Sequence, residues 1–236
     1  MTDKTDAHFL KDGKGPDLLL LHGWQDGKET WRPIIDYLKG DFTCWAPDLP
    51  GFGESSQTTV GTNIQDYARW VESFTKLNKI DKFYLLGHSF GGRISIEVAA
   101  SSYKVEKLIL YGTPIFNDDS TKLKFSKFVS RNLKVKNVPF FSNLLRSGDY
   151  RHAEGALREV LINALNYNPV LRLNKIDAQT LLIWGERDEE VSVDTAYKAK
   201  SLIGKSIIEI LPRLGHFAHL ANPNLFAGKV RTFLKK

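Results

Sequence analysis

The sequence predicts an α/β fold in which a mostly parallel, doubly wound sheet carries a small helical insertion. Short apolar runs rich in branched residues alternate along the chain with segments of helical periodicity. Such alternation is typical of a parallel sheet that helices cover on both faces. The alternation stops between residues 114 and 176, a stretch too long for a loop in a compact domain. We therefore expect a core domain of residues 1–113 and 177–236, with a helical lid of residues 114–176.

The expected core elements follow one another in strict order. Each strand is predicted from a short apolar run, and each helix from apolar residues three or four positions apart. In the stretch 63–78 these are Ile64, Tyr67, Ala68, Val71 and Phe74. The expected strands cover residues 8–13, 17–23, 42–48, 82–88, 105–112, 179–185 and 206–211. The expected helices cover residues 30–40, 63–78, 90–101, 192–203 and 222–236.

The composition favours a globular protein. The 236 residues are 42% hydrophobic, which is enough to bury a sizeable core. The single cysteine, Cys44, forms no intrachain disulfide and is expected as a small buried hydrophobe. The first 15 residues are polar, and no apolar run reaches the roughly 18 residues of a membrane span. We expect a cytoplasmic protein, monomeric or homodimeric, with no integral membrane association.

The net charge of +6 does not by itself indicate a nucleic-acid partner, and none is expected. Much of the excess lies in residues 121–136, a stretch without an acidic residue. Such a stretch either attracts acidic substrates or a membrane surface, or forms the solvated face of an amphipathic helix. We favour the solvated face, because apolar residues recur within the stretch at helical spacing.

A serine lies among glycines where an expected strand gives way to an expected helix. Gly87, His88, Ser89, Phe90 and Gly91 form the pattern G-x-S-x-G, which is typical of a nucleophile elbow. In such a turn the serine takes a strained conformation with positive φ. A Cβ atom at either glycine is expected to collide with the neighbouring strand or helix. A purely structural turn can contain the same pattern, so the motif alone does not establish a nucleophile.

Serine is a weak nucleophile unless a base takes its proton, so an acid and a histidine are expected downstream. His216 and His219 follow the last expected strand. The acids after the penultimate strand are Glu186, Asp188, Glu189 and Glu190. Each group therefore lies at the carboxyl end of an expected strand, the edge of a parallel sheet at which sites form.

Five stretches, LLLLHGW, DLPGFGES, GHSFGG, WGERD and GHFAHLANP, have the order and spacing of the α/β-hydrolase superfamily. Over nearly its whole length the chain resembles a lid-bearing serine hydrolase of this superfamily. The resemblance implies that Ser89 is the nucleophile, Asp188 the acid and His216, which directly follows a glycine, the base. Some relatives carry the acid after an earlier strand, where this chain has Asp118 and Asp119. Asp188 is preferred because the stretch WGERD ends a strand and needs no rearrangement.

The resemblance also implies where a substrate binds. The backbone N–H groups of Trp24 and Phe90 are expected to form an oxyanion hole. The same two side chains are expected to wall the substrate pocket, together with His22, Phe116 and Phe140. For His22 the role of a scaffold that holds its loop is the more strongly expected one.

Two features depart from the family pattern. Ala221 and Asn222 stand where many relatives carry a glutamate before the proline. The residues before 17–23 offer only one strand, 8–13, so an outer antiparallel strand of the family's sheet is expected to be missing.

Together these residues predict a carboxylesterase that needs no metal or organic cofactor and acts on small to medium esters. The same triad would also serve a hydrolase of C–C bonds in meta-cleavage products, a lactonase or a thioesterase. A receptor-like homologue that binds a ligand with little turnover is the alternative from another class. Serine at the elbow argues against dehalogenase or epoxide hydrolase chemistry, which this superfamily runs through an aspartyl ester.

Overall fold

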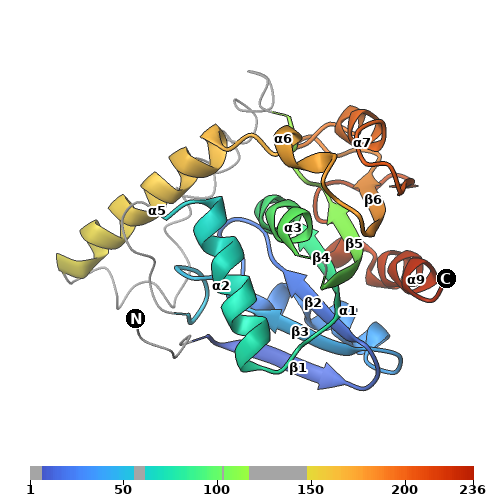
Figure 1. Ribbon diagram of the computed structural model, residues 1–236, viewed down its shortest axis with the longest axis horizontal. Helices are drawn as coiled ribbons and strands as arrows, with labels where there is room; N and C mark the ends of the chain where they lie inside the picture. The colour runs from blue at the N-terminus through green and yellow to red at the C-terminus, as the bar shows by residue number, and fades with distance from the viewer. Residues whose placement is uncertain (1–6, 56–61, 103, 117–147) are drawn as a thin grey trace.

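The structure is a computed structural model that describes residues 7–55, 62–102, 104–116 and 148–236 (Figure 1). For residues 148–155 it describes the backbone alone. The predicted basic stretch 121–136 and much of the predicted lid therefore lie outside the described residues.

One sheet organises the described part of the chain, with its strands in the order β1-β3-β2-β4-β5-β6-β7. Strand β1 pairs with β3 in the antiparallel sense, and all other neighbours are parallel. The predicted mostly parallel, doubly wound α/β fold is thus confirmed. The strands are β1 (Phe9–Gly13), β2 (Asp17–Leu21), β3 (Thr43–Pro47), β4 (Phe83–His88), β5 (Val105–Tyr111), β6 (Gln179–Gly185) and β7 (Ser206–Leu211).

The helices lie on both sides of this sheet (Figure 1). Two short ones, η1 and α8, were not predicted. The first replaces the start of the predicted helix 30–40, since Pro33 lacks the N–H that a continuous helix would need there. The helices are η1 (Lys28–Trp31), α1 (Arg32–Leu38), α2 (Ile64–Leu77), α3 (Phe90–Ser101), α5 (Gly148–Asn166), α6 (Val170–Leu173), α7 (Asp194–Lys200), α8 (Ala218–Ala221) and α9 (Pro223–Leu234).

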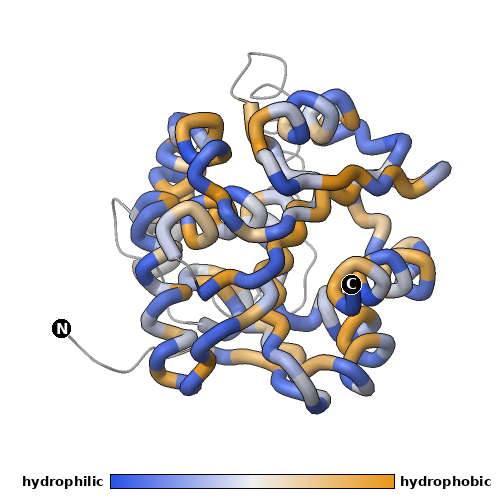
Figure 2. Tube along the Cα trace, turned by 45° about the vertical axis from the view of Figure 1, so that its right-hand side comes forward, coloured by the Kyte–Doolittle hydropathy of each residue, from blue (hydrophilic) through white to orange (hydrophobic). Residues whose placement is uncertain are grey.

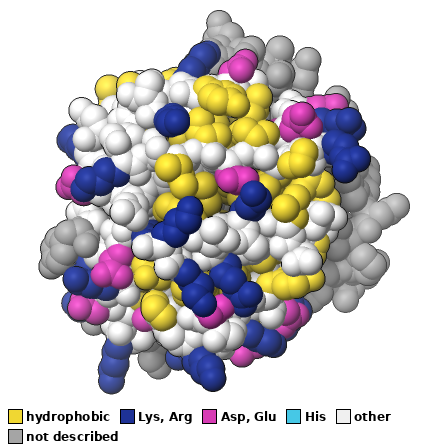
Figure 3. Space-filling view, turned by 90° about the vertical axis from the view of Figure 1, so that its right-hand side faces the viewer, with side chains coloured by type: hydrophobic (Ala, Val, Ile, Leu, Met, Phe, Trp, Pro, Cys, Tyr) yellow, Lys and Arg dark blue, Asp and Glu magenta, His cyan; other side chains and the backbone are white. Residues whose placement is uncertain are grey.

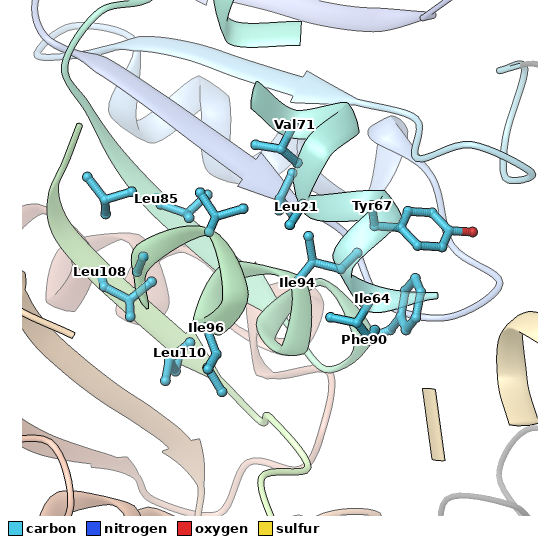
Figure 4. Close-up of a cluster of buried hydrophobic side chains, with 14 of the residues drawn as sticks. Leu21, Ile64, Tyr67, Val71, Leu85, Phe90, Ile94, Ile96, Leu108 and Leu110 are labelled. Carbon is cyan, nitrogen blue, oxygen red and sulfur yellow. The ribbon is translucent and has the colours of Figure 1, made fainter. Parts of the chain in front are cut away.

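Alternate residues of the central strands feed two separate hydrophobic clusters. In β2, Leu19 and Leu21 point to the cluster that α2 and α3 complete, whereas Leu18 and Leu20 point to the one that α1 and α9 complete. Hydrophobic segments accordingly run through the interior of the trace (Figure 2). Figure 4 shows the first cluster, in which side chains of α2 and α3 meet those of the strands. Every central strand is therefore apolar on both faces, as its near-continuous hydrophobic sequence predicted.

Helix α2 has the capping expected of a stable helix start. The side chain of Asn63 accepts a hydrogen bond from the amide of Asp66, and the Asp66 carboxylate accepts one from the amide of Asn63. At the end of the chain Asn222 caps α9 by accepting from the amide of Leu225 over 3.1 Å. One of the two departures from the family pattern thus has a structural role.

The segment between β5 and β6 is tied to α3 by a buried arginine. Arg93 lies one turn after Ser89 and is 2% exposed. Its guanidinium donates hydrogen bonds to the main-chain oxygens of Pro114, Ala164 and Tyr167. Burial lowers the pKa of Arg93 to about 10, but this value is still high enough for the group to stay charged at neutral pH.

A second link lies one turn further along α3. The carboxylate of Glu97 accepts hydrogen bonds from the hydroxyl of Tyr167, over 2.7 Å, and from both Nε and Nη2 of Arg172. Burial opposes ionisation of Glu97, yet these donors hold its pKa below the usual value. The segment between β5 and β6 is therefore bonded to α3 near both of its ends, at Pro114 and at Ala164 to Arg172.

The remaining expectations concern the surface and the cysteine. Cys44 is completely buried in β3, as predicted. The face that carries α9 and the C-terminus mixes apolar side chains with Lys, Arg, Asp and Glu (Figure 3). Across the described ranges, no helix combines the length and the apolarity needed to cross a membrane.

Candidate active site

Ser89 occupies a sharp turn between β4 and α3. Its backbone has φ 51° and ψ −110°, a left-handed conformation that is costly for a residue with a side chain. The turn is held by a hydrogen bond from the Ser89 amide to the Tyr111 carbonyl, at 2.9 Å. Ser89 is 1% exposed, and its hydroxyl has no hydrogen-bond partner among the described residues. The structure thus holds a strained serine whose Oγ atom accepts and donates no hydrogen bond in the part of the chain that is described.

The two flanking glycines are required by close backbone contacts. A Cβ atom at Gly87 would lie 2.5 Å from the carbonyl oxygen of Gly91. A Cβ atom at Gly91 would lie 2.5 Å from the carbonyl oxygen of Leu21 and 2.6 Å from that of His22. The Gly91 amide also donates to the His22 carbonyl at 3.1 Å. The predicted collisions are therefore confirmed. Because Gly91 has no Cβ atom, the start of α3 can lie against the end of β2.

His216 and Asp188 are joined by a hydrogen bond. Nδ1 of His216 lies 2.8 Å from Oδ2 of Asp188, and both residues are less than a tenth exposed. The other carboxylate oxygen, Oδ1, accepts the amides of Glu190 at 3.0 Å and Val191 at 2.8 Å. Since a carboxylate only accepts, Nδ1 carries the proton and Nε2 is the basic nitrogen.

The end of β5 brings the Ser89 turn and the His216 loop together. The Tyr111 hydroxyl donates to the carbonyl of His216 at 2.5 Å, while the Tyr111 carbonyl accepts the Ser89 amide. Gly112, with φ 50°, follows directly, and a Cβ atom there would lie 3.1 Å from the His216 ring. The ring of His88, the residue before Ser89, lies 4.7 Å from the His216 ring, centroid to centroid, and is tilted by 45° against it.

The neighbouring histidines are neutral. Burial, with further contributions from His216 and His219, holds the pKa of His88 well below its usual value. Burial, followed by the influence of His216, lowers the pKa of His219 to about 3. At neutral pH neither ring therefore adds a positive charge beside His216.

Two backbone amides flank Ser89. The chain at Gly23 runs close to the serine, since a Cβ atom there would lie 3.5 Å from Cβ of Ser89. Trp24 follows Gly23, and Phe90 is the first residue of α3. In the part of the chain that the structure describes, neither of these amides donates a hydrogen bond. Both are thus available to a bound group.

The expected pocket residues have different surroundings. Trp24 packs edge-on against Phe90, with ring centroids 5.3 Å apart, and both are buried. Phe116 is half-buried against the same cluster. Phe140, like the alternative acids Asp118 and Asp119, lies outside the described residues.

His22 has both ring nitrogens engaged by the backbone. Nε2 accepts the amide of Leu49 at 2.9 Å, so Nδ1 donates to the Gly23 carbonyl at 2.8 Å. The ring is completely buried. These contacts hold the ring within its loop, and a contact of His22 with substrate stays a prediction.

Tyr111 was missed as a contributor to this site. The sequence predicted it only as one of the last residues of an apolar strand, whose side chains are buried on both faces of the sheet. Its position directly before a glycine, at the carboxyl end of a central strand, was the available signal.

The chain is similar to known hydrolases along almost its whole length. A family model described as alpha/beta hydrolase fold matches residues 16–169. The chain is 28% identical over 259 residues to the 2-hydroxy-6-oxo-6-(2'-aminophenyl)hexa-2,4-dienoic acid hydrolase of Metapseudomonas resinovorans. The matched region covers 98% of this chain and 88% of that protein. The chain is also 26% identical over 261 residues to haloalkane dehalogenase 2 of Mycobacterium tuberculosis (strain H37Rv), covering 94% and 89%.

The fold is also similar to that of solved structures. The esterase EaEST from Exiguobacterium antarcticum superposes with a TM-score of 0.83 at 21% identity, covering 100% of this chain and 97% of that one. At this identity the likeness concerns the fold alone.

Proposed function

The chain belongs to the alpha/beta hydrolase fold family, and from this premise we propose that it is a serine hydrolase that cleaves carboxylic esters with small to medium acyl or alcohol groups. The observation that carries the proposal is the buried hydroxyl of Ser89, which lies on a strained strand-to-helix turn and has no hydrogen-bond partner within the described ranges. A serine held in this way has a conformational cost without a structural hydrogen bond in return, which is typical of a nucleophile.

In the proposed reaction Ser89 Oγ attacks the acyl carbon while His216 Nε2 takes the hydroxyl proton. Asp188 holds the Nδ1–H tautomer and stabilises the imidazolium that forms. The carbonyl oxygen becomes an oxyanion between the amides of Trp24 and Phe90, each worth about 2.7–4 kcal/mol in the transition state. His216 then protonates the departing alcohol, and a water molecule releases the acid by the same steps in reverse.

The direct test compares the hydrolysis of p-nitrophenyl acetate and butyrate by the wild type and Ser89→Ala. Turnover is expected to fall by more than about 10³-fold, because the attacking oxygen is lost. Ser101→Ala is the matched control, since it removes an exposed hydroxyl at the other end of the same helix. If Ser89→Ala turned over esters as fast as the wild type, the mechanism would be wrong.

A second candidate is hydrolysis of a C–C bond in a meta-cleavage product. It is favoured by the 28% identity to the hydrolase from Metapseudomonas resinovorans, whose name gives a dienoic acid of this kind as substrate. A panel of vinylogous diketones, lactones, thioesters and simple esters separates the candidates by kcat/KM. We expect simple esters to give the highest values.

A receptor-like protein with a misaligned triad would bind ligands without turnover. A fluorophosphonate probe distinguishes this case, because it reacts only with an activated serine. We expect covalent labelling of the wild type at Ser89 and none of Ser89→Ala.

A further inference from the structure

Three side chains outside the proposed triad converge behind the Ser89 turn. Asp26, His88 and His219 each offer a metal-ligating atom, and these atoms lie within 4.8 Å of one another. His88 comes from the end of β4 and His219 from α8, while Asp26 lies in the loop between β2 and η1. Both histidines are at most 1% exposed, and Asp26 is half-buried.

The hydrogen bonds around His219 determine which of its nitrogens is protonated. The Tyr111 hydroxyl donates to the His216 carbonyl, and its oxygen is then an acceptor for Nδ1–H of His219, 3.2 Å away. Nε2 of His219 is therefore the unprotonated nitrogen. It accepts a hydrogen bond from the hydroxyl of Thr30 at 2.9 Å, a donor that an ion bound to this nitrogen would displace.

The same reasoning applies to His88. Its Nε2 lies 3.1 Å from the His216 carbonyl and must donate to it, which leaves Nδ1 unprotonated. Among the described residues Nδ1 has no hydrogen-bond partner. It faces the loop, because a Cβ atom at Gly23 would lie 3.0 Å from it. A completely buried lone pair without a donor needs an occupant.

We infer that Asp26, His88 and His219 bind a divalent transition-metal ion, with Zn²⁺ as the best match. Two imidazole nitrogens and one carboxylate form a usual Zn²⁺ ligand set, and a water molecule can complete the tetrahedron. The carboxylate offsets part of the ion's charge, and its partial exposure gives an ion a way in. The site uses no triad residue, and the ion is not needed for the proposed ester hydrolysis.

The test measures Zn²⁺ binding to the full chain by calorimetry and Co²⁺ binding by visible absorption. We expect one ion per chain, with the intense visible bands of tetrahedral Co²⁺. Asp26→Asn keeps the amide contact to Gly27 but removes the charge, and we expect it to weaken binding by more than about tenfold. His219→Gln is expected to do the same. A thermal melt without metal verifies that each variant is folded.

Controls separate this site from other ligands on the chain. Asp81→Asn and His8→Gln change exposed residues of the same types and should leave binding unchanged. His216→Asn should also leave it unchanged, since a metal held by the triad would be lost in this variant. The inference is overturned if the wild type binds neither ion, as expected when a water molecule fills the site. It is equally overturned if Asp26→Asn binds like the wild type, or if only His216→Asn abolishes binding.

Discussion

The Tyr111 hydroxyl donates a hydrogen bond to the main-chain carbonyl of His216 at 2.5 Å. The carbonyl of the same tyrosine accepts the amide of Ser89 at 2.9 Å. A single residue at the end of β5 therefore fixes both the turn of the proposed nucleophile and the loop of the proposed base. The distance between these two groups depends on the placement of Tyr111.

Tyr111→Phe is expected to reduce kcat while KM changes little. The variant keeps the ring and the backbone bond to Ser89 but frees the His216 loop, and a displacement of the base by about 1 Å can cost up to about 100-fold. The rate of fluorophosphonate labelling should fall in parallel. Tyr37→Phe, which alters an exposed phenol, is the control. An unchanged kcat in Tyr111→Phe would contradict the positioning role.

Asp188→Asn is expected to lower kcat by up to about 10⁴-fold. The amide oxygen can still accept from Glu190 and Val191, but the amide NH₂ then faces His216. The imidazole must turn to the tautomer with Nε2 protonated, which cannot take the serine proton. Glu189→Gln, an exposed change in the same loop, should retain full activity. Equal activities of the two variants would rule out Asp188 as the acid.

The buried histidines make stability depend on pH. Burial, and then the neighbouring His216, lowers the pKa of His219 from 6.5 to about 3, so the unfolded chain binds protons that the folded chain does not. The contribution is complete above about pH 6.5 and is lost as the pH falls toward 3. The free energy of unfolding should therefore decrease by about 1.4 kcal/mol per pH unit for each such histidine.

Urea unfolding at several pH values between about 4 and 6 measures this slope. His219→Gln should reduce the slope of the unfolding free energy against pH by the contribution of one buried histidine. His8→Gln, an exposed site, should leave it as in the wild type. A slope that His219→Gln does not change would show that the ring is not buried in its neutral form.

Two glycine-to-alanine changes should have opposite effects on the stability of the fold. Gly91→Ala forces a methyl group against the Leu21 and His22 carbonyls, so it should destabilise the fold and prevent probe labelling. The methyl group of Gly228→Ala, in α9, would meet no atom of the described residues within 4 Å, and this variant should stabilise the protein by about 1 kcal/mol. Thermal melts of both variants test this pair. A stable, active Gly91→Ala would show that the elbow is not closely packed.

The strands were predictable because each central strand is apolar on both faces, and this pattern does not depend on partners. Helix α2 was predictable because its apolar side and its cap at Asn63 agree. The short helices η1 and α8 were not, since each contains only four residues. Helices of this length have no periodicity to read and form because of what they pack against.

The residues of the proposed triad could be singled out because the roles proposed for them require particular residue types at strand ends. The contacts around them could not be anticipated in the same way. His88 and Tyr111 act through the main-chain carbonyl of a residue more than 100 positions away, and nothing in the local sequence encodes such a pairing. Whether the segment 114–176 forms a lid over the site stays a prediction.

The links from α3 to the inserted segment set rules for building chimeras. Arg93 binds main-chain oxygens, which a donor sequence of any composition supplies at positions 114, 164 and 167. Glu97, by contrast, is matched only by the phenol of Tyr167 and the guanidinium of Arg172. A chimera whose foreign sequence ends before Tyr167 therefore keeps the bonds to Glu97. A chimera that also replaces Tyr167 and Arg172 would leave the buried Glu97 carboxylate without these donors.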